Sequence, residues 1–173
     1  LVLHAGDLLY PSFQPYLEDL RYFSVYRDLL TTTPFYPVLG NHEALAGSNA
    51  VERFLQLFPN PANDVTGTGH FYSLDYGDVH FAALFLPMRV YDSYYPNAVM
   101  TESSRQYQWL ASDLAKTQKP WKVVYAHVPL LSSGYHRGDY AQGLFDQPEY
   151  RRVLLPLFER YGVQLYLSGH DHD

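Results

Sequence analysis

Short apolar stretches that alternate with amphipathic stretches constrain the fold of this chain more than any other feature. Six stretches have the composition and length of β-strands: residues 1–4, 35–39, 71–76, 79–86, 122–126 and 163–168. Between them, apolar residues at helical spacing predict helices over residues 15–30, 50–58, 103–115 and 148–161. Strands that alternate with helices predict an α/β fold with a parallel sheet. The turn at Gly77 and Asp78 adds an antiparallel hairpin to it.

The ends of these helices carry local signals. Ser103 and Gln106 have the spacing of a capping box at the start of the third helix. Gly162 is placed to end the fourth helix, because glycine adopts the backbone conformation that closes many helices. In the first helix, the residues expected near one buried face are Leu17, Leu20, Phe23 and Leu30.

Composition excludes several classes of protein. The 173 residues suit one domain, and 18 acidic against 12 basic residues give a formal charge of −6. An acidic chain is poorly suited to binding nucleic acid or anionic membranes, and no apolar run approaches the roughly 20 residues of a membrane span. The absence of cysteine excludes disulfides, thiolate metal sites and a cysteine nucleophile. Most of the 17 tyrosines are expected to be packing residues.

Polar side chains with metal-binding capacity follow four of the predicted strands. In chain order, the residues at these strand ends are Asp7, Asn41 with His42, His127, and His170 with His172. The carboxyl ends of parallel strands meet at one edge of a sheet, where ligands bind. Oxygen and imidazole ligands without thiolate suit iron, manganese or zinc. The other strand-associated histidines, His4, His70 and His80, are expected to have structural roles.

Four motifs at these positions carry a family resemblance. They are Gly6-Asp7-Leu8-Leu9-Tyr10, Gly40-Asn41-His42-Glu43, Val124-Tyr125-Ala126-His127 and Gly169-His170-Asp171-His172. In this order they resemble the successive motifs of calcineurin-like metallophosphoesterases. Tyr10 and Glu43 are similar to the residues at these positions in the purple acid phosphatase branch. The resemblance implies an α/β/β/α sandwich of mixed sheets with the helices outside.

The resemblance also implies a role for each residue. Asp7 would bridge two metal ions, Tyr10 and His172 would bind a ferric ion, Fe(III), and a divalent Fe, Zn or Mn ion would complete the centre. The ligands implied for the divalent ion are Asn41, His127 and His170. His42 and His136 would contact the substrate, and one of them would protonate the leaving group. The alternative for His136 is an exposed loop histidine. Arg137 would either hold the phosphate or be a solvated surface residue.

Two family features are missing from the sequence. The family's first motif, Asp-x-Gly, would lie before Gly6, and further strands would follow His172. We therefore expect residues 1–173 to form a single, partial catalytic domain, incomplete at both termini. The resemblance further implies an extracellular or periplasmic location.

The leading functional hypothesis is metal-dependent hydrolysis of phosphate monoesters, with a small phosphate ester as substrate and no nucleic acid or membrane partner. A phosphodiesterase acting on cyclic nucleotides or nucleotide esters is the alternative within enzymes, and Tyr10 and Glu43 favour the phosphatase. A non-catalytic binding module that keeps the fold is a second alternative. A third is an adhesive role for the tyrosine-rich loops, which contain Tyr91, Tyr94 and Tyr95. The sequence leaves the oligomeric state open.

Overall fold

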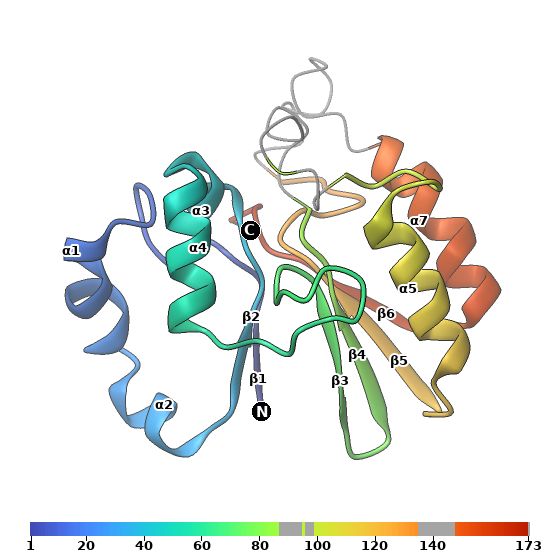
Figure 1. The fold of residues 1–173 in the computed structure, drawn as a ribbon, viewed down its shortest axis with the longest axis horizontal. Coiled ribbons are helices and arrows are strands. Elements are labelled where there is room, and N and C mark those ends of the chain that lie inside the picture. The colour runs from blue at the N-terminus through green and yellow to red at the C-terminus, as the bar shows by residue number, and fades with distance from the viewer. Residues whose placement is uncertain (87–94, 96–98, 135–147, 173) are drawn as a thin grey trace.

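Two sheets form the centre of the computed structural model, which describes residues 1–86, 95, 99–134 and 148–172 (Figure 1). The smaller sheet pairs β1 (Val2–His4) with β2 (Phe35–Pro37) in parallel. The larger sheet has the order β3, β4, β5, β6, and its strands are Tyr72–Tyr76, Val79–Ala83, Trp121–Tyr125 and Leu165–Leu167. β3 and β4 form an antiparallel hairpin, whereas β4, β5 and β6 run parallel.

Helices cover the outer face of each sheet. The elements beside β1 and β2 are α1 (Pro15–Glu18), the π-helical turn η1 (Asp19–Phe23), α2 (Arg27–Thr32), α3 (Asn41–Leu45) and α4 (Ser48–Leu57). The larger sheet is covered by α5 (Arg105–Lys116) and α7 (Pro148–Tyr161) (Figure 1). This arrangement confirms the predicted α/β/β/α sandwich. None of the helices in the described part of the chain is long and apolar enough to cross a membrane.

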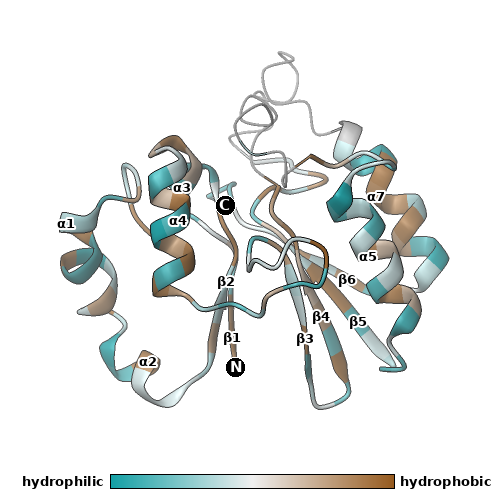
Figure 2. Ribbon diagram, viewed as in Figure 1, coloured by the Kyte–Doolittle hydropathy of each residue, from teal (hydrophilic) through white to brown (hydrophobic). Residues whose placement is uncertain are grey.

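Three buried clusters correspond to the contacts between these layers. Under α5 and α7, the cluster includes Ala82, Val124, Leu110, Leu114 and Leu154. Between the two sheets, the buried residues are Val38, Tyr72, Ala83 and Tyr125. Beside the smaller sheet, Leu9, Leu39, Val51 and Phe54 belong to the third cluster. Figure 2 shows hydrophobic stretches on the strands and alternating hydrophobic and hydrophilic stretches along α4, α5 and α7.

The strand predictions are confirmed at all six places, although β5 is shifted by one residue and the other five strands are shorter than predicted. The hairpin at Gly77 is confirmed as well, and Tyr76 pairs with Val79 across it. The alternating pattern of strands and helices indicates one parallel sheet, and this prediction is wrong. Within the described residues, β1 and β2 pair with each other and not with the larger sheet, because the side chains of Tyr72 and Tyr125 pack between the two sheets as a separate layer contact.

The predicted helix over residues 15–30 is wrong as a continuous element. It is divided into α1, η1 and α2, and the Ser24 N–H donates to the Asp19 carbonyl in the wide turn of a π-helix. The wide turn rotates the buried face, so Leu20 is 69% exposed while Tyr22 is buried. Tyr22 packs edge-on against Phe58, at 5.4 Å between ring centroids, and this aromatic contact prevails over helical periodicity.

The helix-end predictions have mixed outcomes. Gly162 ends α7 with a φ of +68°, as predicted. At α5 the cap is Ser104 rather than Ser103, and its hydroxyl accepts the Tyr107 N–H at 3.3 Å. Gln106 does not cap the helix, because its buried amide is bonded to the backbone N–H and carbonyl of Phe85. The short helix α3 was not predicted.

The tyrosine-rich loops are only partly described. Tyr91 and Tyr94 lie outside the described residues. Tyr95 is buried, and its hydroxyl donates to the Ala44 carbonyl at 3.1 Å. Tyr95 is therefore a packing residue, and it offers no surface for adhesion.

Candidate metal centre

The predicted ligands come from both sheets. Asp7 and Asn41 follow β1 and β2, whereas His127 follows β5 and His170 follows β6. The Ala126 N–H donates to the Leu167 carbonyl, and the Gly169 N–H to that of His127, so the β5 and β6 ends lie together. The carboxyl ends of the two parallel strand pairs thus meet where the sheets face each other.

Three buried ligand atoms converge on one point. Asn41 Oδ1 lies 2.8 Å from His127 Nε2 and 2.9 Å from His170 Nδ1, and the two nitrogens are 3.1 Å apart. All three residues are less than 10% exposed. These are the three residues predicted to hold the divalent ion.

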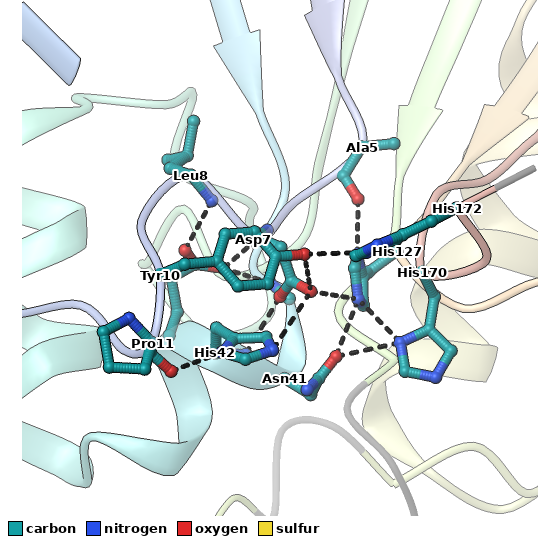
Figure 3. Close-up of polar contacts among 12 residues, drawn as sticks. Ala5, Asp7, Leu8, Tyr10, Pro11, Asn41, His42, His127, His170 and His172 are labelled. Carbon is teal, nitrogen blue, oxygen red and sulfur yellow. Dashed lines mark hydrogen bonds and ion pairs between the residues drawn. The ribbon is translucent and has the colours of Figure 1, made fainter. Parts of the chain in front are cut away.

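A carboxylate oxygen of Asp7 joins this group to a second one (Figure 3). Asp7 Oδ2 lies 3.1 Å from His127 Nε2 on one side and 3.1 Å from the Tyr10 hydroxyl on the other. The Tyr10 hydroxyl is in turn 3.0 Å from His172 Nε2. One oxygen atom therefore borders both predicted ligand groups, as a bridging carboxylate would.

The hydrogen bonds of His127 test whether these residues suit a cation. His127 Nδ1 lies 2.6 Å from the Ala5 carbonyl oxygen, which can only accept, so Nδ1 carries the proton. In the neutral ring, Nε2 then presents a lone pair to the oxygens of Asp7 and Asn41, which also present lone pairs. These atoms repel one another unless a positive charge, either a ring proton or a metal ion, lies between them. Because a second imidazole nitrogen, that of His170, converges on the same point, the donor set fits a metal ion.

The electrostatics of the centre also favour positive charge. Burial alone would raise the pKa of Asp7, but the hydrogen bond and charge of His127 and the His42 N–H lower it to about 2. Burial lowers the pKa of His127, but the Asp7 carboxylate, the Ala5 carbonyl and the Glu43 charge together outweigh it, and the net direction is upward. For Tyr10, burial and the Asp7 charge both raise the pKa above its usual 10, so a phenolate here requires a cation.

Glycines before the ligands allow the loops to approach closely. A Cβ on Gly6 would lie 2.8 Å from His127 Nδ1, and one on Gly169 would lie 2.9 Å from the Ala5 carbonyl. A Cβ on Gly40 would overlap the Asp7 carboxylate. Asp7 itself has a φ of +57°, a conformation that non-glycine residues adopt rarely and often at functional sites.

The Glu43 side chain connects the loop that carries Asp7 to the loop that carries Asn41. Its fully buried carboxylate accepts the N–H groups of Asp7 at 2.9 Å, Leu8 at 2.8 Å and Gly40 at 2.7 Å. Burial and the Asp7 charge raise the pKa of Glu43, and the N–H groups of Gly40 and Leu8 and the His127 charge oppose the shift. The Gly40 contact also caps the start of α3, since Glu43 is the third residue of that helix.

His42 lies beside the ligands rather than among them. Its Nδ1 donates to the Pro11 carbonyl, which leaves Nε2 as the free ring nitrogen, 3.9 Å from Asp7 Oδ2. The ring packs on Tyr10 with 4.2 Å between centroids, and the side chain is 23% exposed. Nε2 is thus held in a fixed direction at the edge of the centre.

The structure brings together six predicted metal ligands and one predicted substrate contact, His42. The six are Asp7, Tyr10, Asn41, His127, His170 and His172. His136 and Arg137 lie outside the described residues, and their roles stay predictions. Sequence reasoning missed the Ala5 and Pro11 carbonyls, for which no side-chain signal exists. It also missed the positioning role of Glu43, although the spacing from Gly40 is that of a helix cap.

Comparison with known proteins decides the family. The sequence model of the calcineurin-like phosphoesterase family matches residues 1–173. This chain belongs to that family. The yellow lupin (Lupinus luteus) purple acid phosphatase PPD1 has the same fold, with a TM-score of 0.79 and 25% identity over 99% of this chain and 30% of the lupin chain.

The related sequences are named acid phosphatases, and several of them purple acid phosphatases. Human "acid phosphatase type 7" is 29% identical over 99% of this chain and 39% of its own length. The Arabidopsis thaliana "Fe(3+)-Zn(2+) purple acid phosphatase 12" is 28% identical over 99% of this chain and 36% of its own. The Arabidopsis "probable inactive purple acid phosphatase 24" is 29% identical over 100% and 28%. This calcineurin-like phosphoesterase chain thus spans less than half the length of these relatives.

Proposed function

We propose that this chain hydrolyses phosphate monoesters at a centre of two metal ions. The observation that carries the proposal is the position of Asp7 Oδ2, 3.1 Å from both His127 Nε2 and the Tyr10 hydroxyl. Similarity to proteins named acid phosphatases supports this reaction.

The ligand groups differ in chemistry, and this supports two different ions. Asn41, His127 and His170 offer one amide oxygen and two imidazoles, a set that suits divalent Zn, Mn or Fe. Tyr10 and His172 offer a phenol and an imidazole, and a phenolate suits Fe(III). When bound, two such ions would attract the phosphate oxygens and lower the pKa of the water molecule that attacks the phosphorus atom.

His42 is the described residue best placed to act on the substrate. Its Nδ1 is committed to the Pro11 carbonyl, so Nε2 is the atom that can bind a phosphate oxygen or carry a proton. Hydrolysis breaks the bond from phosphorus to the ester oxygen, and that oxygen needs a proton as it leaves. We propose that His42 or His136 donates this proton.

Paired substrates and a matched pair of histidine variants test the proposal. The purified protein should bind two metal ions and hydrolyse p-nitrophenyl phosphate faster than bis(p-nitrophenyl) phosphate. His127→Ala should abolish turnover and reduce metal content. His70→Gln, which changes a half-buried histidine bonded to Thr68, should preserve both.

Three results would contradict parts of the proposal. Turnover retained in His127→Ala would refute the metal assignment. A preference for the diester would identify a phosphodiesterase. Two bound ions without turnover of either substrate would indicate a non-catalytic module, as the name of one related protein suggests for that protein.

A further inference from the structure

A second charged cluster lies at the other end of the larger sheet. Its central residue is His80, near the start of β4, whereas the metal centre lies beyond the carboxyl ends of the parallel strands. The side chain is 7% exposed and contacts two carboxylates from different elements. His80 Nδ1 lies 2.8 Å from Asp75 Oδ1 on β3, and Nε2 lies 2.8 Å from Asp113 Oδ2 on α5.

Both contacts require an extra proton on the ring. A neutral imidazole carries one N–H, so one of its nitrogens would turn a lone pair toward a carboxylate oxygen. The imidazolium carries two N–H groups and can donate to both carboxylates at once. Asp113 is further oriented by the Ser73 hydroxyl, which donates to its other oxygen at 3.0 Å. The arrangement is therefore complete only when His80 is charged.

Other charged groups surround the cluster. Lys119 Nζ lies 3.9 Å from Asp75 Oδ2, and a surface hollow beside His80 is also lined by Asp78 of the hairpin turn and Lys116 of α5. On β5, Lys122 pairs with His80 in the sheet register, and its Nζ donates to the Tyr161 carbonyl at the end of α7. The hollow gives solvent, and hence protons, access to the ring.

We propose that His80 is a proton-dependent clasp that holds α5 against the β3–β4 hairpin more tightly at acidic pH than at alkaline pH. Burial lowers the pKa of His80, but the hydrogen bonds and charges of Asp113 and Asp75 outweigh it and raise the pKa above the usual 6.5. The folded state thus binds the proton more tightly than the unfolded state. The stabilisation is complete below about 6.5 and is lost as the pH rises through the folded-state value. The clasp depends on neither the metal centre nor the proposed reaction.

Thermal unfolding of the purified protein tests the clasp. His80→Gln removes the titrating group, so the melting temperature of the wild type should exceed that of the variant by a few degrees at about pH 6. The difference should shrink toward about pH 9. The matched control is His70→Gln, because burial lowers the pKa of His70, and the difference for that variant should grow as the pH rises. A His80→Gln difference that is the same at both pH values would overturn the proposal.

Two measurements on the wild type keep the test valid if His80→Gln does not fold. The ring proton resonances of His80 should titrate above pH 6.5, and a lower midpoint would refute the clasp. Amide exchange in residues 109–116 of α5 should accelerate several-fold more between about pH 6 and about pH 9 than exchange in residues 153–160 of α7. Equal acceleration of amide exchange in the two helices would show that the charge on His80 does not hold α5 in place.

Discussion

Removing one acceptor from Glu43 should weaken both the fold and the metal centre. Glu43 is 0% exposed, and its Oε2 accepts two N–H groups while Oε1 accepts the third. In Glu43→Gln, the amide oxygen can replace Oε2, but the NH₂ group then faces the Leu8 N–H, which is also a donor. A buried donor left unpaired costs about 1–3 kcal/mol.

The net cost should remain within that range. The two retained bonds to Asp7 and Gly40 weaken, since a neutral oxygen accepts less strongly than a carboxylate. Glu43→Gln also removes a buried negative charge close to Asp7, which offsets part of this loss. We therefore expect the free energy of unfolding to fall by about 1–3 kcal/mol. Because Asp7 loses its fixed position, metal affinity should fall about 10–100-fold.

Urea unfolding and metal titration of the purified protein measure these two effects. Glu18→Gln is the matched control, because Glu18 is also a buried carboxylate but binds Arg53 through two 2.6 Å hydrogen bonds, apart from the ligand loops. The Glu18→Gln substitution should lower the free energy of unfolding and leave metal affinity unchanged. If Glu43→Gln changed neither quantity, the three N–H groups would not depend on this carboxylate. If it reduced stability alone, Glu43 would support the fold without positioning Asp7.

Four further substitutions have defined outcomes. Gly40→Ala should cost about 1–3 kcal/mol of stability and lower metal content, because the new Cβ overlaps the Asp7 carboxylate. Gly77→Ala, with open space but a φ of +57°, should cost about 1–2 kcal/mol and keep the metal, as unfolding and metal analysis would show. Tyr22→Phe should leave stability unchanged or raise it by about 1 kcal/mol, because its buried hydroxyl has no hydrogen-bond partner among the described residues, and a loss in urea unfolding would contradict this. Tyr10→Phe should abolish a visible charge-transfer band of the iron-loaded protein, and a band that persists would place the phenolate elsewhere.

The strands and the ligand positions could be predicted because both depend on local sequence. Apolar runs mark each strand, and the residue after each strand end is fixed to one edge of its sheet. The adjacent positions of His127 and His170, at the ends of the paired strands β5 and β6, follow from this rule, whereas Asn41 approaches them from the other sheet. The division into two sheets could not be predicted, because it depends on which side chains fill the space between the layers, as Tyr72 and Tyr125 do.

Contacts between distant segments account for what the sequence could not predict. η1 arises where Tyr22 packs on Phe58, 36 residues further along the chain, and this contact is invisible to helical periodicity. His80 was expected to be structural, and its Asp75 partner lies opposite it in the hairpin register. Its second partner, Asp113, is 33 residues away on α5, and no local pattern joins the two. Hairpin pairing was therefore predictable, whereas the clasp was not.

The central claim of the proposed function is that the Asp7 carboxylate would bridge two bound metal ions. Anomalous X-ray diffraction from crystals of the metal-loaded protein, recorded at the iron and zinc edges, tests it most directly. We expect two peaks that share Asp7, one beside Tyr10 and His172 and the other beside Asn41, His127 and His170. A single peak, or two peaks of which only one touches Asp7, would contradict the bridging role.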